Sequence, residues 1–244
     1  MITIPAKRLT AKIRATAFAL SATLAAITQL TAAPPQAAVG STAVYPLKVS
    51  ANGRYLVDQK NVPFLIVGDT PQGLMGRLTE AQAEFYFADR QAHGFNTLGW
   101  IDVACAGSDY RDNKAGSTPD GIRPFTGFVS GGKDFAHYDL TKPNEAYFAR
   151  LDHVVTLAAK HGLLAFIDPI ETIGWLPTLR NNGLASAYSY GQYLGRRYKR
   201  FANVAWLNGN DFRRRSGPTS TQSWRRGCLS RATMSSPVSA AKSS

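Results

Sequence analysis

Acidic side chains follow four apolar stretches of this chain. Asp69 comes after the first stretch, Asp102 after the second, Asp168 and Glu171 after the third, and Asp211 after the fourth. Carboxylates gathered in one place can accept hydrogen bonds from sugar hydroxyl groups, and a pair of them can catalyse glycoside hydrolysis by acid/base chemistry. These five acids are therefore the first candidates for a chemical site.

Aromatic and amide side chains lie close to these acids in the sequence. Trp100 precedes Asp102, Trp175 follows Glu171, and Trp206 and Asn208 precede Asp211. Binding sites for sugars combine flat apolar surfaces with a few polar groups that fix the orientation of the ligand. The mixture suits carbohydrate better than it suits a metal, because no spacing of His and Cys resembles a zinc site. We expect no cofactor.

Four of these acids also have a purely structural interpretation. Asp69 stands before a Thr-Pro pair and fits the capping of a turn as well as it fits contact with a substrate. Asp102 fits the start of a loop better than a site. Asp168 could end its strand and Glu171 could be a solvated loop acid, and for both residues the structural interpretation is slightly favoured.

The three tryptophans also have both a structural and a binding interpretation. Trp100 and Trp206 lie within apolar stretches, where a core position is more common than a platform for a sugar ring. Trp175 falls in an expected loop, and there a binding role and a structural role are equally supported. All three therefore need the structure to decide between them.

Helices and strands that would position these residues alternate along the chain. The pattern predicts a hairpin around Asn52-Gly53 and a buried strand at 63–67. Further strands are predicted at 95–101, 163–168 and 203–207. A stretch rich in Gly, Asp, Ser and Pro at 102–141 is too long for an ordinary connection and is therefore either functional or mobile.

Three amphipathic helices separate the predicted strands. The first begins at Thr79 with Gln82 three residues later, which matches a capping box, and ends at Gly94. The second begins near Pro143 and the third spans about 184–200. The expected apolar faces consist of Ala81, Phe85, Ala88 and Ala92 in the first helix, Phe148, Leu151, Val155 and Ala158 in the second, and Ala187, Tyr190, Leu194 and Tyr198 in the third.

This β-α-β-α-β-α-β order predicts an α/β fold with a parallel sheet covered by helices. The sequence lacks both a Gly-x-Gly-x-x-Gly after the first strand and a Gly-Lys-Ser/Thr loop, so nucleotide-binding open sheets lose support. A barrel is the other possible closure. An eight-stranded barrel typically needs about 250 residues, and the body at 39–212 provides enough for roughly half of one. In either closure the carboxyl ends of the strands form the site.

The two ends of the chain carry most of its net charge of +12. Residues 1–38 and 213–244 contain eleven Lys and Arg and no acid, so the body is almost neutral. A nucleic-acid binder should carry its positive charge on the folded surface, and we therefore exclude that class.

Residues 1–38 have a basic start, an uncharged run and two prolines, which predicts an export signal in preference to a membrane anchor. The protein is then secreted or periplasmic, with no stable membrane span after the signal is removed. The Ser- and Arg-rich residues 213–244 predict a disordered tail. Because the composition changes abruptly at Phe212, we hypothesise that a reading-frame change or truncation replaced the true continuation.

Several blocks of the body resemble the apiosidase-like glycoside hydrolases, glycoside hydrolase family 140, which was formerly a domain of unknown function. The resemblance covers residues 55–211 and most of the body. The matching blocks lie at 52–58, 64–70, 78–90, 94–97, 147–148 with 152–153, and 203–211.

The resemblance implies a (β/α)8 barrel that acts on plant cell-wall glycans, with apiose-containing pectin side chains as the known substrate class. It also implies that Asp211 is the general acid/base, although Gly209-Asn210-Asp211 departs slightly from the Gly-Gly-Asp of the family. The remaining candidates for lining the sugar site are Asp69, Trp100, Asp168, Glu171, Trp175 and Asn208.

A larger departure from the family concerns the second catalytic carboxylate. In the family the nucleophilic Glu comes from a late strand, and neither this Glu nor the usual C-terminal β-sandwich has a counterpart here. We therefore expect the N-terminal part of a glycoside hydrolase, truncated to about four βα units and inactive alone. A non-catalytic carbohydrate-binding remnant and a non-functional frameshifted product are the alternatives.

Overall fold

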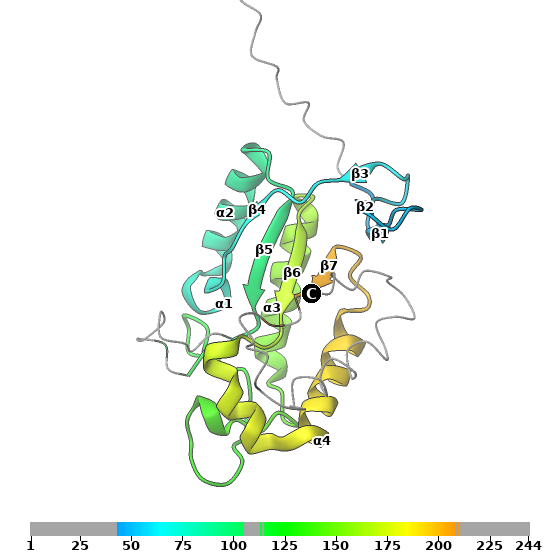
Figure 1. The fold of residues 1–244 in the computed structure, drawn as a ribbon. Helices are drawn as coiled ribbons and strands as arrows, with labels where there is room; N and C mark the ends of the chain where they lie inside the picture. The colour runs from blue at the N-terminus through cyan, green and yellow to red at the C-terminus, as the bar shows by residue number, and fades with distance from the viewer. Residues whose placement is uncertain (1–42, 105–112, 114, 208, 210–244) are drawn as a thin grey trace, which may run out of the picture. The chain divides into compact units, whose positions relative to one another are not determined.

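The structure is a computed structural model, and it describes residues 43–104, 113, 115–207 and 209. The expected export signal and basic tail lie outside the described residues, as do Asn208 and Asp211. The elements in chain order are β1 (Lys48–Val49), β2 (Leu56–Val57), β3 (Pro63–Phe64), β4 (Gly68–Asp69), α1 (Leu74–Arg77), α2 (Glu80–Ala92), β5 (Thr97–Asp102), η2 (Phe135–His137), α3 (Glu145–Lys160), β6 (Leu164–Asp168), α4 (Thr172–Tyr198) and β7 (Val204–Trp206) (Figure 1).

Strands β4, β5, β6 and β7 form a parallel sheet in that order. Helix α2 connects β4 to β5, α3 connects β5 to β6, and α4 connects β6 to β7. This confirms the predicted alternation of strands and helices. Because neighbouring strands are parallel, the carboxyl ends of all four strands lie at the same end of the sheet.

Strands β1, β2 and β3 form a small antiparallel sheet. The predicted turn at Asn52-Gly53 is present, since Gly53 has a φ of 72° and its N–H donates to the carbonyl of Ser50. The predicted buried strand at 63–67 is wrong. Its first two residues form β3, the regular parallel strand starts only at Gly68, and Leu65 between them is 78% exposed.

Helix α2 begins with the predicted capping box. Thr79 Oγ1 accepts the N–H of Gln82, and Gln82 Oε1 accepts the N–H of Thr79. The predicted buried face of this helix is wrong, because Ala83 and Phe87 are the buried residues, whereas Phe85 is 77% exposed. The predicted residues Ala81, Ala88 and Ala92 are also exposed.

Helices α3 and α4 follow the predictions more closely. The predicted face of α3 is buried, and Asn144 caps its start by accepting the N–H of Ala146. Helix α4 starts earlier than expected, at Thr172, and breaks at Gly183, where φ is 73°. The part after Gly183 corresponds to the predicted third helix.

The described part of the long stretch after β5 packs against α4. Two isolated antiparallel β-bridges, Phe125 to Pro143 and Phe128 to Tyr138, join its strands of chain into a loop. Phe125 and Tyr138 are buried in the main core with aromatic residues of α3 and α4. Residues 105–112 and 114 lie outside the described part.

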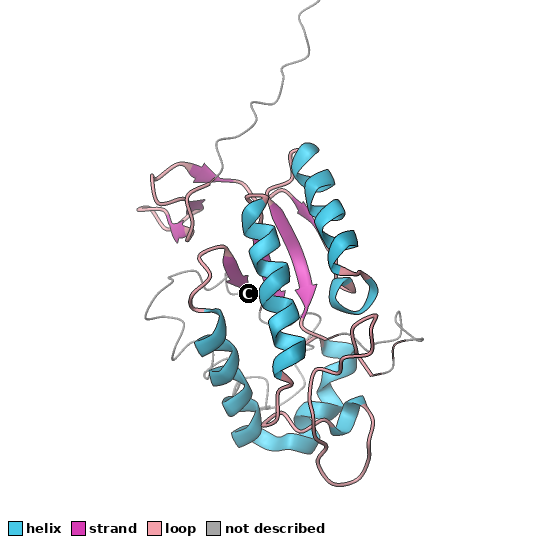
Figure 2. Cartoon of the chain, turned by 180° about the vertical axis from the view of Figure 1, so that it is seen from behind, coloured by secondary structure: helices cyan, strands magenta, loops and turns pink. Residues whose placement is uncertain are grey.

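The two faces of the sheet pack against different partners. Ala165 and Ile167 of β6 face the main core with the helices, and α3 lies in front of the sheet in Figure 2. Leu164 and Phe166 alternate with them and face the opposite way, where they pack with Leu47 of the small sheet. We call the first the helix face and the second the inner face.

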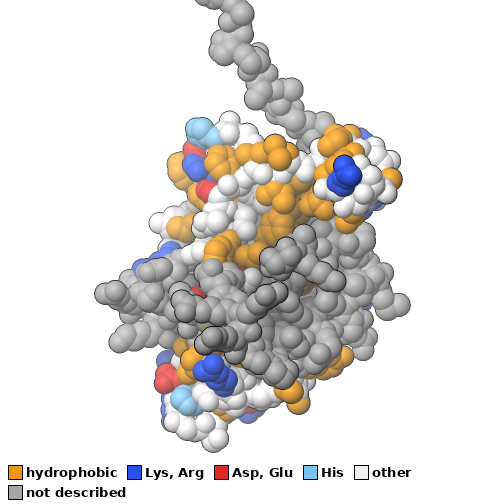
Figure 3. Space-filling view, in the orientation of Figure 1, with side chains coloured by type: hydrophobic (Ala, Val, Ile, Leu, Met, Phe, Trp, Pro, Cys, Tyr) orange, Lys and Arg blue, Asp and Glu red, His pale blue; other side chains and the backbone are white. Residues whose placement is uncertain are grey.

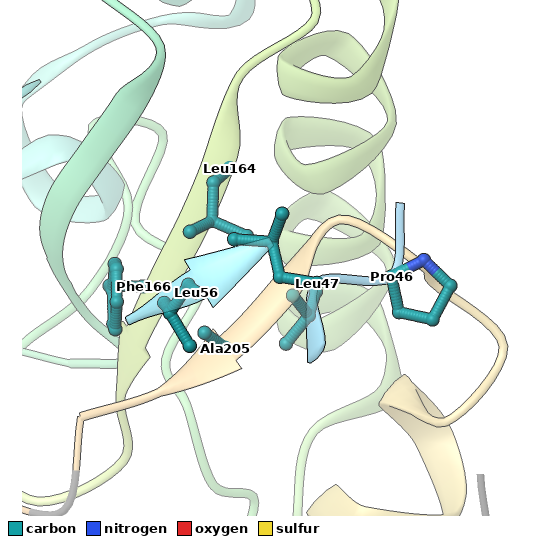
Figure 4. Close-up of a pocket in the computed structure, with 7 residues that line it drawn as sticks. Pro46, Leu47, Leu56, Leu164, Phe166 and Ala205 are labelled. Carbon is teal, nitrogen blue, oxygen red and sulfur yellow. The ribbon is translucent and has the colours of Figure 1, made fainter. Parts of the chain in front are cut away.

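An apolar pocket lies on the inner face (Figure 4). It is lined by Pro46, Leu47, Leu56, Leu164, Phe166, Val204 and Ala205. Leu164 is the first residue of β6 and Asp168 is the last, so the pocket and the acids lie at opposite ends of that strand. The residues that line the pocket are all apolar, which suits packing of the small sheet against the strands and offers no polar side chain to orient a sugar.

Candidate functional site

An irregularity in β5 brings two of the predicted acids to the same face. Leu98 pairs with Ala165 and Ile101 with Ile167, so β5 uses one more residue than β6 over the same distance. Such a bulge shifts the alternation of side chains by one position. Asp102 therefore pairs with Asp168, and both lie on the inner face at the carboxyl ends of their strands.

The carboxyl group of Asp168 is enclosed, with the residue 0% exposed. Its Oδ1 accepts the N–H groups of Ile170 and Gly209, each at 3.2 Å. Within the described part of the chain, no donor lies within hydrogen-bond distance of Oδ2. Burial, followed by the charges of Asp102 and Glu171, raises the pKa of Asp168 to about 8, so this acid is mostly protonated at neutral pH.

Asp102 is 1% exposed and contacts Trp100. The indole Nε1–H of Trp100 donates to Asp102 Oδ1 at 2.7 Å. Residues two positions apart in a strand lie on the same face, which allows this contact. Trp100 itself is only partly buried, in contrast to the acid that it contacts. A partly exposed aromatic residue held by a buried carboxylate is a suitable surface for a sugar ring.

Glu171 lies at the start of α4 and is buried. Its Oε2 accepts the N–H of Gly174 at 2.8 Å, and its carbonyl accepts the N–H of Trp175 at 3.2 Å. A carboxylate in this position satisfies one of the free N–H groups of the first turn and complements the helix dipole. The alternative of a solvated loop acid is therefore wrong, because the side chain caps a helix.

Asp69 lies on the helix face, since it pairs with Leu98 of the main core. Its Oδ2 is 3.4 Å from Nη1 of Arg90, and it accepts a hydrogen bond from Tyr86, both on α2. Burial of the phenol, followed by the hydrogen bond to the Asp69 carboxylate, raises the pKa of Tyr86. Asp69 thus fastens α2 to the sheet and is directed away from Asp102 and Asp168.

Trp175 belongs to α4 and not to a loop, which corrects the predicted position. It is 0% exposed and stacks on Tyr190 with the ring centroids 5.7 Å apart. Its Nε1–H donates to the carbonyl of Ala104 at 2.8 Å. In this conformation the ring offers no surface to a ligand, and it anchors the chain just after β5.

Trp206 is on the helix face of β7, with its ring 5.9 Å from that of Tyr198. The structure therefore agrees with the core interpretation of this residue. Tyr147 of α3, which no sequence pattern indicated as part of the site, donates its hydroxyl to the carbonyl of Val103 at 2.6 Å. Tyr147 and Trp175 together fix the two residues that follow Asp102, and only the tertiary packing reveals this.

The site is thus built around Asp102, Asp168, Glu171 and the partly buried Trp100. In the described residues, no group of three or more His, Cys, Asp or Glu is arranged to hold a metal ion. A helix long and apolar enough to cross a membrane is likewise absent from the described segments.

The family model of the apiosidase-like catalytic domain matches residues 50–237. This chain belongs to the apiosidase-like family. The match extends past Phe212 into the stretch interpreted above as a basic tail. Among curated proteins, none matches the chain.

Solved structures support the same fold. A protein described as a glycoside hydrolase aligns with a TM-score of 0.59 and 24% identity, over 80% of this chain and 40% of its own. A glycoside hydrolase family 5 protein from Bacteroides vulgatus aligns with a TM-score of 0.57 and 22% identity, over 78% and 37%. The apiosidase-like chain therefore spans less than half the length of these structures.

The architecture is that of a TIM-type barrel, in which β4 to β7 provide four of the eight parallel strands. The inner face of the sheet corresponds to the interior of the barrel, and the helix face corresponds to its outer layer. Active sites of such barrels lie at the carboxyl ends of the strands. The buried acids Asp102 and Asp168 occupy that end of the apiosidase-like chain.

Proposed function

We propose that this chain is the N-terminal part of an exported glycoside hydrolase that recognises plant cell-wall glycans, with apiose-containing pectin side chains as the substrate class. One observation carries the proposal beyond family membership. The bulge in β5 directs Asp102 to the inner face beside Asp168, at the end of the sheet where glycoside hydrolases of this architecture bind their substrates.

In this proposal Asp211 is the general acid/base, and Trp100 and Asn208 contact the sugar. Common glycosidases need a second carboxylate, about 5 to 5.5 Å away for retention and farther away for inversion. Glu171 is engaged by the first turn of α4, and Asp168 is enclosed, so both are poorly placed to replace the missing nucleophile. We therefore expect glycan binding without hydrolysis by the chain alone.

A raised pKa is the property expected of a general acid, and that of Asp168 lies in the range such a group needs. A proton donor must also come within hydrogen-bond distance of the leaving oxygen. Since Asp168 is 0% exposed, we assign it no direct contact with the substrate.

A carbohydrate-binding remnant without catalytic function is the second candidate. The capping role of Glu171 and the burial of Asp168 favour it, because they remove the two acids that could complete a catalytic pair. The two candidates agree on binding and differ in whether Asp211 retains a chemical role.

The test measures binding and cleavage of apiose-containing pectin oligosaccharides by the full chain, using calorimetry and chromatography of products. We compare the natural chain with Asp211→Ala and Trp100→Ala, and use Asp120→Asn, which changes an exposed acid, as the control. Weaker binding by Trp100→Ala supports the proposed site. Hydrolysis that is lost in Asp211→Ala would show that a complete carboxylate pair exists. A folded chain that binds no such oligosaccharide contradicts the proposal.

A further inference from the structure

Asp168 connects the end of β6 to the segment that follows β7. Among the described residues, the last backbone hydrogen bond from the β7 segment to β6 runs from the N–H of Leu207 to the carbonyl of Ile167 at 2.9 Å. Beyond it, the side chain of Asp168 accepts the N–H of Gly209 at 3.2 Å. The carboxyl group therefore extends the β6–β7 connection past the point where the regular ladder ends.

The backbone geometry at Gly209 fits this role. Its φ of 77° lies in the left-handed region, where glycine is favoured because it has no Cβ. The residue whose N–H is held by Asp168 thus has a backbone conformation that residues with a side chain rarely adopt. Asp211 follows two residues later in the sequence.

Asp168 also holds the segments that follow β6 and β5. Its Oδ1 accepts the N–H of Ile170, which orders the turn into α4. Its backbone carbonyl accepts the N–H of Val103 at 3.0 Å, which fixes the exit of β5. Three exits from the sheet, after β5, β6 and β7, thus meet at one enclosed residue.

We infer that Asp168 is a positioning residue: its Oδ1 holds the segment that leads to Asp211 and so sets where that acid/base lies. The inference rests on the proposed function for the role of Asp211, and it replaces direct sugar contact as the function of Asp168. The protonated state of Asp168 at neutral pH supports it, because an uncharged carboxyl group can remain enclosed without a counter-ion.

The experiment uses the full chain labelled with ¹⁵N and ¹³C and needs no sugar. The amide signal of Gly209 is followed from pH 5 to pH 10, with Gly53 as the reference glycine, since it also has positive φ but is held by a backbone carbonyl in an exposed turn. We expect the Gly209 signal to shift with a midpoint near 8, the pKa of Asp168, and that of Gly53 to remain still at this pH.

Two substitutions distinguish the role of Asp168 as a hydrogen-bond acceptor from the effect of its titration. Asp168→Asn keeps a carbonyl oxygen but cannot titrate, so Gly209 should stay protected from hydrogen exchange and lose its shift near pH 8. Asp168→Ala removes the acceptor, and exchange at Gly209 should become about tenfold faster, the scale of one lost hydrogen bond. Asp120→Asn should change neither signal. If Asp168→Ala does not fold, the natural chain and Asp168→Asn still decide the result.

The effect on Asp211 is measured by the pH titration of its carboxyl ¹³C signal. We expect the midpoint to move in Asp168→Ala and to stay unchanged in Asp120→Asn. A Gly209 amide that neither titrates near pH 8 nor exchanges faster in the alanine variant overturns the inference, as does an unchanged Asp211 midpoint in a folded alanine variant. Because no readout depends on glycan, failure of the proposed function would be seen separately.

Discussion

At the scale of single residues, the enclosed carboxyl group of Asp168 makes stability depend on pH. Folding raises the pKa of this acid from 3.8 to about 8, chiefly through burial. Between these values the folded chain binds a proton that the unfolded chain has released. The contribution of this proton to the free energy of unfolding is fully present below pH 4 and is lost as the pH rises through 8.

The resulting prediction concerns Asp168→Asn. This variant cannot ionise at residue 168, so its free energy of unfolding should rise relative to that of the natural chain as the pH increases from 5 to 9. A single proton contributes at most about 1.4 kcal/mol per pH unit. Urea denaturation at pH 5, 7 and 9 measures the difference. Parallel profiles for the two proteins would contradict the raised pKa.

A second residue prediction concerns the bond between Trp100 and Asp102. Trp100→Phe keeps an aromatic ring but removes the indole donor to the buried carboxylate, which should lower the free energy of unfolding by about 1–3 kcal/mol. Trp206→Phe is the matched control, because that ring packs against Tyr198 on the helix face. If Trp100→Phe destabilises no more than the control, the hydrogen bond contributes nothing measurable.

At the scale of elements, α2 explains where sequence patterns succeed and fail. Its start was predictable because the Thr79–Gln82 capping box is a local interaction. Its buried face was not, since the helix carries apolar residues on two sides and the sequence does not say which side meets the sheet. The face with Phe87 packs against the core, and the face with Phe85 is left exposed.

Strand predictions failed for a related reason. The run at 63–67 is apolar throughout, and an apolar run predicts burial only when both of its sides have a neighbour. Within the described part of the chain, residues 65–67 pair on one side, through hydrogen bonds with Asn96 and Thr97 at the start of β5. In the site, the positions of the acids along the chain were predictable from strand order, whereas their faces depended on the bulge and on contacts with α2.

The two phenylalanines of α2 provide a matched pair of substitutions. Phe87→Ala removes a 0% exposed ring from the core and should cost about 3–5 kcal/mol of the free energy of unfolding. Phe85→Ser alters a side chain that is 77% exposed, and its effect should stay within about 0.5 kcal/mol. Thermal and urea denaturation measure both values. Equal losses would mean that Phe85 is covered in solution.

At the scale of the whole molecule, the described strands of the barrel have two outer edges, on β4 and on β7. Beside β4 the side chains of Leu65, Ile66 and Val67 are exposed. Hydrophobic side chains gather between α2 and the small sheet in Figure 3. Exposed strand edges with apolar side chains promote association between chains.

We therefore expect the purified chain to self-associate as its concentration rises. Leu65→Lys places a charge beside the edge of β4 and should shift the population towards monomer with little change in stability, because this side chain is 78% exposed. Leu184→Lys introduces the same charge at an exposed position on α4 and is the control. Sedimentation velocity separates the species. Equal association of both variants would mean that the β4 edge is not involved.

The bulge in β5 takes up one residue more between Leu98 and Ile101 than the facing stretch of β6 contains. Deleting Gly99 would therefore restore regular alternation, with Leu98 and Ile101 still directed towards the helices and Asp102 still beside Asp168. A related chain that is one residue shorter at this place can thus keep its carboxylate in the barrel interior, so a gap in this part of an alignment does not mean that the acid has left the site.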